Sequence, residues 1–154
     1  MEFFQYLAPT KVIFGRGTEA RTGALCKEAG ATKVLIHYGG HSAKKSGLID
    51  RICASLQAEG ISYTELGGVV PNPRLSKVYE GIELGRKEKI DFILAAGGGS
   101  VIDSAKAIAV MAANPGDLWD YIASGTGKGQ PIKNKPLPIV AISTTAGTGS
   151  EADA

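Results

Sequence analysis

The chain has 154 residues, of which 44% are hydrophobic and 21% charged, and its formal net charge is +2. This length allows one domain with a substantial core, and a charge so close to zero gives no indication of binding to nucleic acid or to an anionic membrane. The apolar runs have the length of strands, which excludes a membrane-spanning helix, and Cys26 and Cys53 form no CxxC pair, which favours a reducing, cytoplasmic location.

In chain order, short apolar strands are predicted to alternate with amphipathic helices. Residues 1–6 lack the basic region and apolar stretch of a signal peptide. Strands are predicted at 11–14, 33–37, 61–65, 91–95 and 138–142, and helices at 18–29, 47–58, 74–88, 100–113 and, as a short turn, 118–122. Nearly all-apolar strands between helices are typical of a parallel sheet covered on both faces. We therefore expect an α/β fold, a Rossmann-like and mostly parallel sheet flanked by helices.

The last part of the chain is predicted to be mostly loop. Residues 114–136 are rich in glycine, proline and asparagine, which indicates a connection. Residues 144–154 form a Gly/Thr/Ser segment that ends without a further strand or helix. Because a domain rarely ends on such a loop, we expect the chain to be a piece of a longer protein.

The strongest functional pattern is the glycine turn between the strand at 91–95 and the helix at 100–113. Gly97, Gly98 and Gly99 run directly into Ser100. A strand that enters a helix through glycines exposes backbone N–H groups at the helix N-terminus, where the dipole favours a phosphate. Glycine lets the backbone approach the phosphate oxygens, and Ser100 adds a hydroxyl. The alternative makes Ser100 an N-cap and Asp103 its capping-box partner, but that does not require three consecutive glycines.

A second glycine pattern competes with this turn. Residues 15–20 read Gly-Arg-Gly-Thr-Glu-Ala, which matches the dinucleotide fingerprint G-x-G-x-x-A. The fingerprint also requires an acidic residue at the end of the next strand, to bind the ribose 2′-hydroxyl. Gly39 and Gly40 occupy that place, so we interpret residues 15–20 as a structural turn.

The segment 39–45 reads Gly-Gly-His-Ser-Ala-Lys-Lys, and no carboxylate follows before Asp50. Two glycines, a hydroxyl and two lysines suit a 2′-phosphate better than a 2′-hydroxyl, which favours NADP over NAD. The alternative is a glycine turn followed by solvated lysines. His37 and His41 are too few, and too close to the turn, to predict a metal site.

Two further loops follow predicted elements. Pro71-Asn72-Pro73 is interpreted as a rigid loop in which Asn72 could hydrogen-bond a cofactor. Residues 143–151 combine small hydroxyl side chains with glycines after the last strand, at the carboxyl end where open α/β sheets bind ligands. The alternative for this segment is a flexible tail.

Taken in order, these motifs resemble the iron-containing, or group III, alcohol dehydrogenase family. The matches span essentially the whole chain: Phe14-Gly15-x-Gly17, Gly39-Gly40-x-Ser42, Pro71-Asn72-Pro73, Gly97-Gly98-Gly99-Ser100-x-x-Asp103-x-x-Lys106 and Thr144-Thr145-x-Gly147-Thr148-Gly149-Ser150-Glu151. The last two are specific in combination. Gly39-Gly40-x-Ser42 is similar to the butanol-dehydrogenase-like members, which tend to use NADP.

The resemblance implies the N-terminal domain of a dehydroquinate-synthase-like fold, with residues 1–154 binding a nicotinamide dinucleotide, NADP or NAD. It places the pyrophosphate on Gly97, Gly98, Gly99 and Ser100, with Asp103 nearby. It places the adenosine ribose on Gly39, Gly40 and Ser42, and the nicotinamide side on Thr144, Thr145 and Thr148. Asn72 would border the cofactor.

The resemblance also implies a helical second domain that holds iron or zinc on an Asp and three His, none of which can be assigned within this chain. The full enzyme would transfer a hydride between a small alcohol or aldehyde and the cofactor. We expect residues 1–154 alone to be inactive and to bind neither nucleic acid nor membrane. Whether the protein forms a homodimer is left open. The alternatives are a glycerol-dehydrogenase-like or dehydroquinate-synthase-like relative, and a stand-alone nucleotide-binding module.

Overall fold

The computed structural model describes residues 10–152. Residues 1–6, for which no signal peptide is predicted, lie outside this range. The described residues form a four-stranded sheet in the order β2-β1-β3-β4, in which every neighbouring pair is parallel. The strands are β1 (Lys33–Gly39), β2 (Ser62–Val69), β3 (Phe92–Gly97) and β4 (Ile139–Ser143). The prediction of an α/β fold with a parallel sheet is confirmed.

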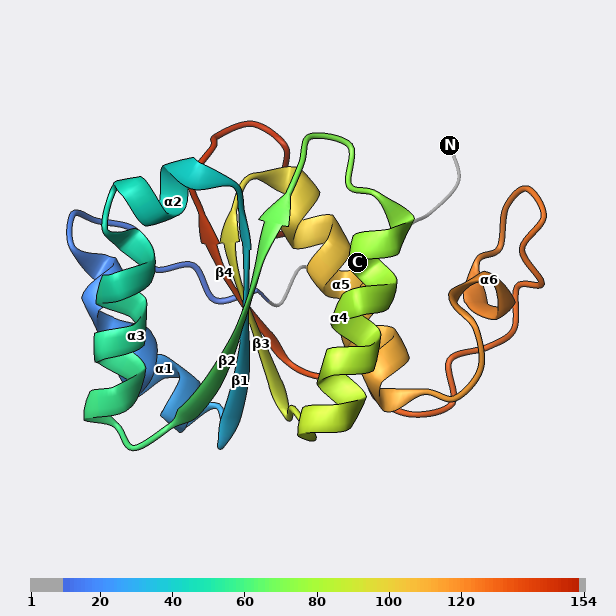
Figure 1. Cartoon of the computed structure of the whole chain (residues 1–154), viewed down its shortest axis with the longest axis horizontal. Coiled ribbons are helices and arrows are strands. Elements are labelled where there is room, and N and C mark those ends of the chain that lie inside the picture. Colours follow the sequence, from blue (N-terminus) through green and yellow to red (C-terminus); the bar gives the residue numbers. More distant parts are fainter. Residues whose placement is uncertain (1–9, 153–154) are drawn as a thin grey trace, which may run out of the picture.

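Helices cover both faces of this sheet (Figure 1). One face packs against α1 (Thr22–Glu28) and α3 (Leu48–Ala58), and the other against α4 (Leu75–Glu88) and α5 (Gly99–Ala113). The central strand β3 is buried along its whole length, which is why residues 92–97 contain no charged side chain. The helical periodicity that predicted these four helices is the pattern of side chains facing the two cores.

Side chains of β1 alternate between the two cores. Val34, Ile36 and Tyr38 belong to the core under α1 and α3, whereas Leu35 belongs to the core under α4 and α5. His37 follows the same alternation as Leu35 and is fully buried. A polar side chain is thereby buried in a strand whose other buried side chains are hydrophobic.

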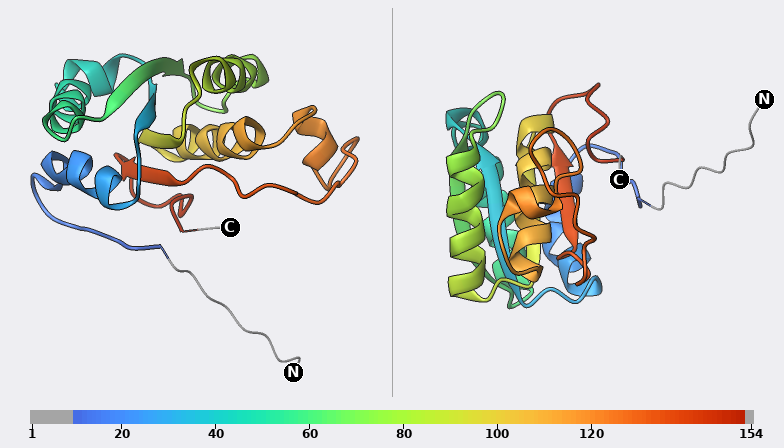
Figure 2. Two further views of the ribbon diagram at one scale, coloured as in Figure 1. Left: turned by 90° about the horizontal axis from the view of Figure 1, so that it is seen from below. Right: turned by 90° about the vertical axis from the view of Figure 1, so that its right-hand side faces the viewer.

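The predicted strand at 11–14 is wrong. These residues are in no strand, and the side chains of Val12 and Phe14 are 75% and 99% exposed. A short apolar run becomes a strand only where a sheet edge offers it hydrogen-bonding partners, and this segment runs outside the sheet (Figure 2). Its described contacts are a hydrogen bond from Thr10 to the Glu151 carbonyl and an ion pair between Lys11 and Glu28.

Three short helices differ from the predicted elements. Residues 18–29 form a 3₁₀ turn, η1 (Thr18–Arg21), followed by α1. The helix α2 (His41–Lys45) was not predicted, because five residues are too few to show helical periodicity. The helix α6 (Leu118–Tyr121) lies in the long connection before β4, which projects away from the sheet (Figure 2).

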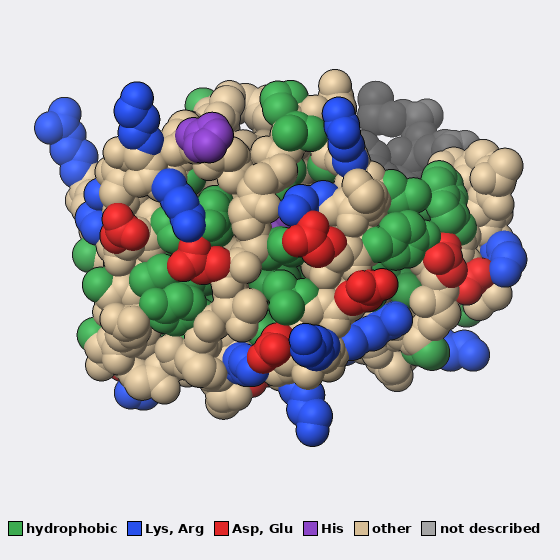
Figure 3. All heavy atoms as spheres, viewed as in Figure 1, with side chains coloured by type: hydrophobic (Ala, Val, Ile, Leu, Met, Phe, Trp, Pro, Cys, Tyr) green, Lys and Arg blue, Asp and Glu red, His purple; other side chains and the backbone are tan. Residues whose placement is uncertain are grey.

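Charges are mixed on the surface. Figure 3 shows basic and acidic side chains interspersed over the face that carries α3, β2 and α4. None of the helices in residues 10–152 combines the length and apolar character needed to cross a membrane.

Candidate functional site

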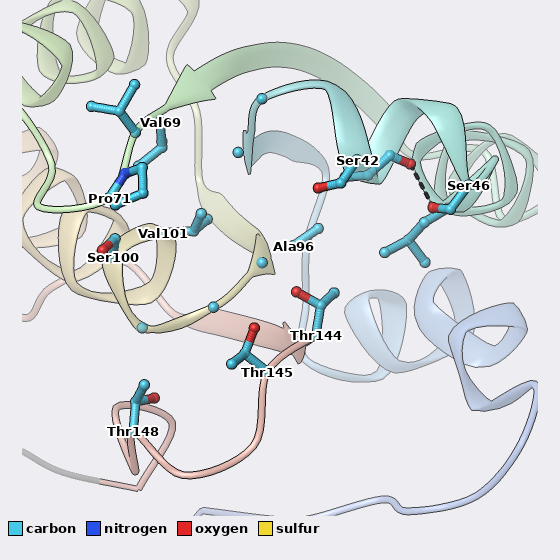
Figure 4. A pocket seen from close by; sticks show the side chains of 18 residues that line it. Ser42, Ser46, Val69, Pro71, Ala96, Ser100, Val101, Thr144, Thr145 and Thr148 are labelled. Atoms are coloured by element: carbon cyan, nitrogen blue, oxygen red, sulfur yellow. Dashed lines mark hydrogen bonds between the residues drawn. The ribbon is translucent and has the colours of Figure 1, made fainter.

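A cavity of about 650 Å³ opens at the carboxyl ends of the strands. Its walls come from the segments that follow β1, β2, β3 and β4, so elements far apart in the sequence meet there (Figure 4). The strand order reverses between β1 and β3, since successive connections leave in opposite directions along the sheet. Open α/β sheets bind ligands at such a switch point.

The glycine turn forms one side of this cavity, and each of its glycines occupies a different structural position. Gly97 ends β3, Gly98 is the N-cap of α5, and Gly99 is the first helical residue. A Cβ on Gly97 would lie 2.5 Å from Val101 Cγ2, because α5 folds back directly over the end of the strand. The turn therefore requires glycine for the packing of the protein itself, before any ligand is considered.

Gly98 and Gly99 face the loop after β4. A Cβ on Gly98 would lie 3.1 Å from Thr145 Oγ1, and one on Gly99 would lie 2.9 Å from Thr148 Cγ2. Side chains at these two positions would push the loop that carries Thr144, Thr145 and Thr148, here called the threonine loop, away from the first turn of α5. The glycines thus bring the loop and the helix N-terminus together at one edge of the cavity.

Ser100 does not cap α5, so the capping-box alternative is wrong. The N-cap is Gly98, no side chain caps the helix, and Ser100 is its second residue, because the helix begins at Gly99 directly after the strand. The Ser100 hydroxyl instead accepts a hydrogen bond of 3.3 Å from the backbone N–H of Asn72. Asn72 has a φ of 55°, a left-handed conformation that asparagine tolerates better than most residues. This bond joins the loop after β2 to the first turn of α5.

The segment after β1 forms another side of the cavity. Ser42 and Ala43 line it from the short helix α2. Lys44 points elsewhere: its Nζ lies 3.2 Å from Glu65 Oε2 and 5.5 Å from the centroid of the Tyr38 ring. One of the two lysines that were predicted to suit a 2′-phosphate is therefore paired with a carboxylate on β2.

The loop after β4 closes the cavity on its third side. Thr144 and Thr145 follow the last strand directly, and their side chains point toward the turn between β3 and α5 (Figure 4). Ser150, further along the same loop, is buried. The backbone N–H of Thr144 donates to the Gly97 carbonyl at 3.0 Å, which fixes the start of this loop against the glycine turn.

The structure brings together all but two of the residues predicted for the site. The cavity is lined by Gly39, Gly40, Ser42, Gly97, Gly98, Gly99, Ser100, Thr144, Thr145 and Thr148. Asn72 and Asp103 are exposed and do not line it, although Asn72 contacts Ser100. Residues 15–20 do not line it either, in agreement with their interpretation as a structural turn.

Sequence reasoning missed the apolar part of the cavity wall. Val69 and Val70 at the end of β2, Ala96 in β3 and Leu48 in α3 also line it. Their apolar character was visible, but it could not be separated from that of core residues, because both occur at strand and helix ends. An apolar wall with a few convergent polar groups is typical of a small-molecule site.

Among the described residues, none that lines the cavity carries a charged side chain. The positive potential available to an anion therefore comes from the N-terminus of α5, whose first N–H groups have no acceptor within the helix. Hydroxyl groups of Ser42, Ser100 and the loop after β4 line the same cavity and can form further hydrogen bonds. This arrangement suits a phosphate-containing ligand held through backbone amides and hydroxyls.

The buried imidazole of His37 gives the stability of this fold a pH dependence. Burial lowers the pKa of His37 from 6.5 to about 4. Between these two values the unfolded chain binds a proton that the folded chain does not, so the free energy of unfolding is expected to fall as the pH drops from 6.5 to 4. Urea denaturation at a series of pH values measures this slope. The variant His37→Gln, which carries no titratable group there, should have a shallower slope; an identical slope would contradict the assignment.

Comparisons with known proteins find related sequences and structures. Residues 9–154 match the protein family described as iron-containing alcohol dehydrogenase. A probable NADH-dependent butanol dehydrogenase of Bacillus subtilis is 47% identical, and the match covers 98% of this chain and 38% of that protein. The NADPH-dependent aldehyde reductase of Escherichia coli is 36% identical, over 100% of this chain and 38% of that protein.

The fold is also shared. The crystal structure of NADH-dependent butanol dehydrogenase A from Thermotoga maritima superposes with a TM-score of 0.89 at 47% identity, over 97% of this chain and 36% of that chain. The chain thus spans less than two-fifths of the length of the proteins that it matches.

Proposed function

Because the chain belongs to the iron-containing alcohol dehydrogenase family, we propose that residues 1–154 form the nicotinamide-dinucleotide-binding domain of a metal-dependent alcohol dehydrogenase. The observation that carries this proposal is the cavity itself. Loops after β1, β3 and β4 converge on the switch point of the sheet, and they present glycines and hydroxyls around a helix N-terminus.

The proposed binding mode follows the three loops. The first amides of α5, at Gly98, Gly99 and Ser100, would hold the pyrophosphate. Gly39, Gly40 and Ser42 would hold the adenosine ribose, and the threonine loop would lie toward the nicotinamide. Asn72 and Asp103 would act from outside the cavity wall, Asn72 through its bond to Ser100. When bound, the nicotinamide supplies the hydride acceptor or donor for a small alcohol or aldehyde.

The metal centre is proposed to lie outside the described residues. Within residues 10–152, no group of three or more His, Cys, Asp or Glu side chains could hold a metal ion. These residues do not fit the iron or zinc that the family implies, so no step of the reaction is assigned to a metal here. We propose that residues 1–154 alone bind dinucleotide without oxidising alcohols, which an absorbance assay at 340 nm would test. The free thiols of Cys26 and Cys53 support a reducing, cytoplasmic location.

We propose that this site binds NADP in preference to NAD. In the part of the chain that the structure describes, no carboxylate lines the cavity near Gly39 and Gly40, so no such group there would repel a 2′-phosphate or select a 2′-hydroxyl. Lys44 is paired with Glu65, so the proposed preference is attributed to the cavity wall and not to this lysine. Of the three similar proteins described above, two are named for NADH and one for NADPH.

Ser42→Asp tests this choice by placing a carboxylate on the cavity wall close to Gly39 and Gly40. The substitution is expected to weaken NADP binding about tenfold or more, because a carboxylate would face the 2′-phosphate, while NAD binding is kept. Calorimetric titration of the unsubstituted protein and of Ser42→Asp with each cofactor measures the effect. Ser42→Asn, similar in size but uncharged, is the matched control. Tighter binding of NAD than of NADP by the unsubstituted protein would contradict the proposed preference.

The nucleotide-binding proposal itself is tested by titrating the protein with NADP, NAD and ADP. Binding of all three with micromolar or tighter affinity for the dinucleotides is the expected result. A protein that is folded by circular dichroism but binds none of the three would contradict the proposal.

A further inference from the structure

His37 is a fully buried polar side chain that lies outside the cavity wall and has no part in the proposed binding mode. It stands near the carboxyl end of β1, two residues before Gly39. Its ring lies between β2 and α5, on the face of the sheet that α4 and α5 cover. Such a group in an apolar core costs stability unless both of its nitrogens are satisfied.

Both ring nitrogens of His37 have partners. Nδ1 lies 3.1 Å from the backbone oxygen of Leu66 in β2, and Nε2 lies 2.7 Å from Ser104 Oγ in α5. A carbonyl oxygen can only accept, so Nδ1 carries the proton of the neutral ring. Nε2 is then an acceptor, and the Ser104 hydroxyl donates to it. The imidazole, carried by the inner strand β1, therefore joins the edge strand β2 to α5.

Ser104 connects this bridge to the first turn of α5. Its Oγ lies 2.9 Å from the Ser100 carbonyl oxygen and 3.0 Å from the Val101 carbonyl oxygen, whereas the imidazole nitrogen is the nearest acceptor at 2.7 Å. A hydroxyl with one proton cannot donate fully to all three. By accepting this hydrogen bond, His37 holds Ser104, and with it the first turn of α5, in a fixed position relative to the sheet.

We propose that His37 is a positioning residue that holds the N-terminal turn of α5 in place for the cofactor's pyrophosphate, acting through Ser104. The inference rests on the proposed nucleotide site. Hydrogen bonds from backbone amides to a phosphate weaken steeply with distance and angle, so a small displacement of this turn lowers affinity. Apolar contacts determine which face of α5 packs on the sheet. A hydrogen bond restricts the position of α5 along the helix axis more narrowly, because a hydrogen bond has a preferred direction.

The two hydrogen bonds of the imidazole can be tested separately by substitution. Asn at position 37 has an amide nitrogen at the place of Nδ1 and can still donate to Leu66, but it does not reach Ser104. Gln is longer, and its carbonyl oxygen can take the place of Nε2 as the acceptor for Ser104. Ser104→Ala removes the hydroxyl itself and leaves the imidazole in place.

The experiment measures the dissociation constants of NADP, NAD and ADP for these variants in the full-length protein, by calorimetry at a temperature where each variant is folded. His37→Asn and Ser104→Ala are expected to weaken binding of all three ligands about tenfold, or about 1.4 kcal/mol, because all three carry the pyrophosphate. His37→Gln is expected to restore affinity to within about twofold of the unsubstituted protein.

Ser55→Ala is the matched control. The Ser55 hydroxyl also bridges elements of the fold: it accepts from the Gly23 N–H at 2.9 Å and donates to the Ala20 carbonyl at 2.8 Å. It lies on α3, on the opposite face of the sheet from α5. Its loss is expected to lower the midpoint of thermal unfolding without changing any dissociation constant.

A second readout follows the imidazole directly. The ¹⁵N resonance of His37 Nε2 is expected to shift when NADP or ADP is added, because a phosphate bound at the first turn of α5 alters the hydrogen bond between Ser104 and this nitrogen. Unchanged dissociation constants in His37→Asn and Ser104→Ala, with normal binding by the unsubstituted protein, would overturn the inference and leave the proposed function intact. Absence of binding by the folded, unsubstituted protein would overturn both.

Discussion

Replacing Gly99 by valine is expected to lower the affinity for nicotinamide dinucleotides more than tenfold while the sheet stays folded. A Cβ at this position would lie 2.9 Å from Thr148 Cγ2 and 3.1 Å from Ser150 Oγ, and the two methyl groups of valine extend further. The loop after β4 would have to move away from the first turn of α5. Overpacking of this kind costs about 1–3 kcal/mol when the native geometry is kept. A displaced loop must return to that geometry to bind, and every ~1.4 kcal/mol spent on this lowers affinity about tenfold.

Gly98→Ala is expected to lower the affinity in the same way but to a smaller extent. Its Cβ would lie 3.1 Å from Thr145 Oγ1, a contact that a shift of a few tenths of an ångström relieves, so the loss of affinity should be smaller. Calorimetric titration with NADP measures both variants, and far-ultraviolet circular dichroism reports whether they fold. Gly85→Ala on α4 is the matched control for affinity. Unchanged affinity in Gly99→Val would remove this turn from the binding site.

The substitution Gly23→Ala is expected to lower the free energy of unfolding by about 3 kcal/mol, the upper part of the usual range for overpacking. A Cβ on Gly23 would lie 2.0 Å from the backbone carbonyl oxygen of Ser55, so the backbones of α1 and α3 would have to separate. That separation would also stretch the hydrogen bond between the Gly23 N–H and Ser55 Oγ. Backbone atoms cannot move aside as the end of a side chain can, which is why the cost is large.

Urea denaturation of Gly23→Ala, followed by circular dichroism, measures this loss. Gly85→Ala is again the control, because it places the same methyl group on a helical glycine with space for it: the Cβ would lie 3.5 Å from Ala112 Cβ. That variant should gain about 0.5–1 kcal/mol from the lower backbone entropy of alanine. Equal stability of the two variants would contradict the close approach of α1 and α3.

Local patterns determined the layers of this protein and the chemistry of its loops. The runs at 33–37 and 91–95 are apolar on both alternating faces, so they predict strands covered by helices on both sides, as observed. Glycines and hydroxyls at the ends of these strands predict a phosphate-binding edge, because the carboxyl ends of parallel strands share one edge of the sheet. The failure at 11–14 has the same origin: an apolar run shows that a segment could pair, not that a partner lies beside it.

The partners of each side chain were decided by the tertiary structure alone. The sequence predicted the glycine turn at 97–99, but the order β2-β1-β3-β4 places Gly99 against Thr148 and joins His37 on β1 to Ser104 on α5. The same order pairs Lys44 with Glu65, away from the cavity that its neighbour Ser42 lines. Periodicity and turn chemistry are properties of neighbouring residues, whereas these contacts join residues many positions apart. They depend on which strands lie side by side and on which face each connecting helix packs.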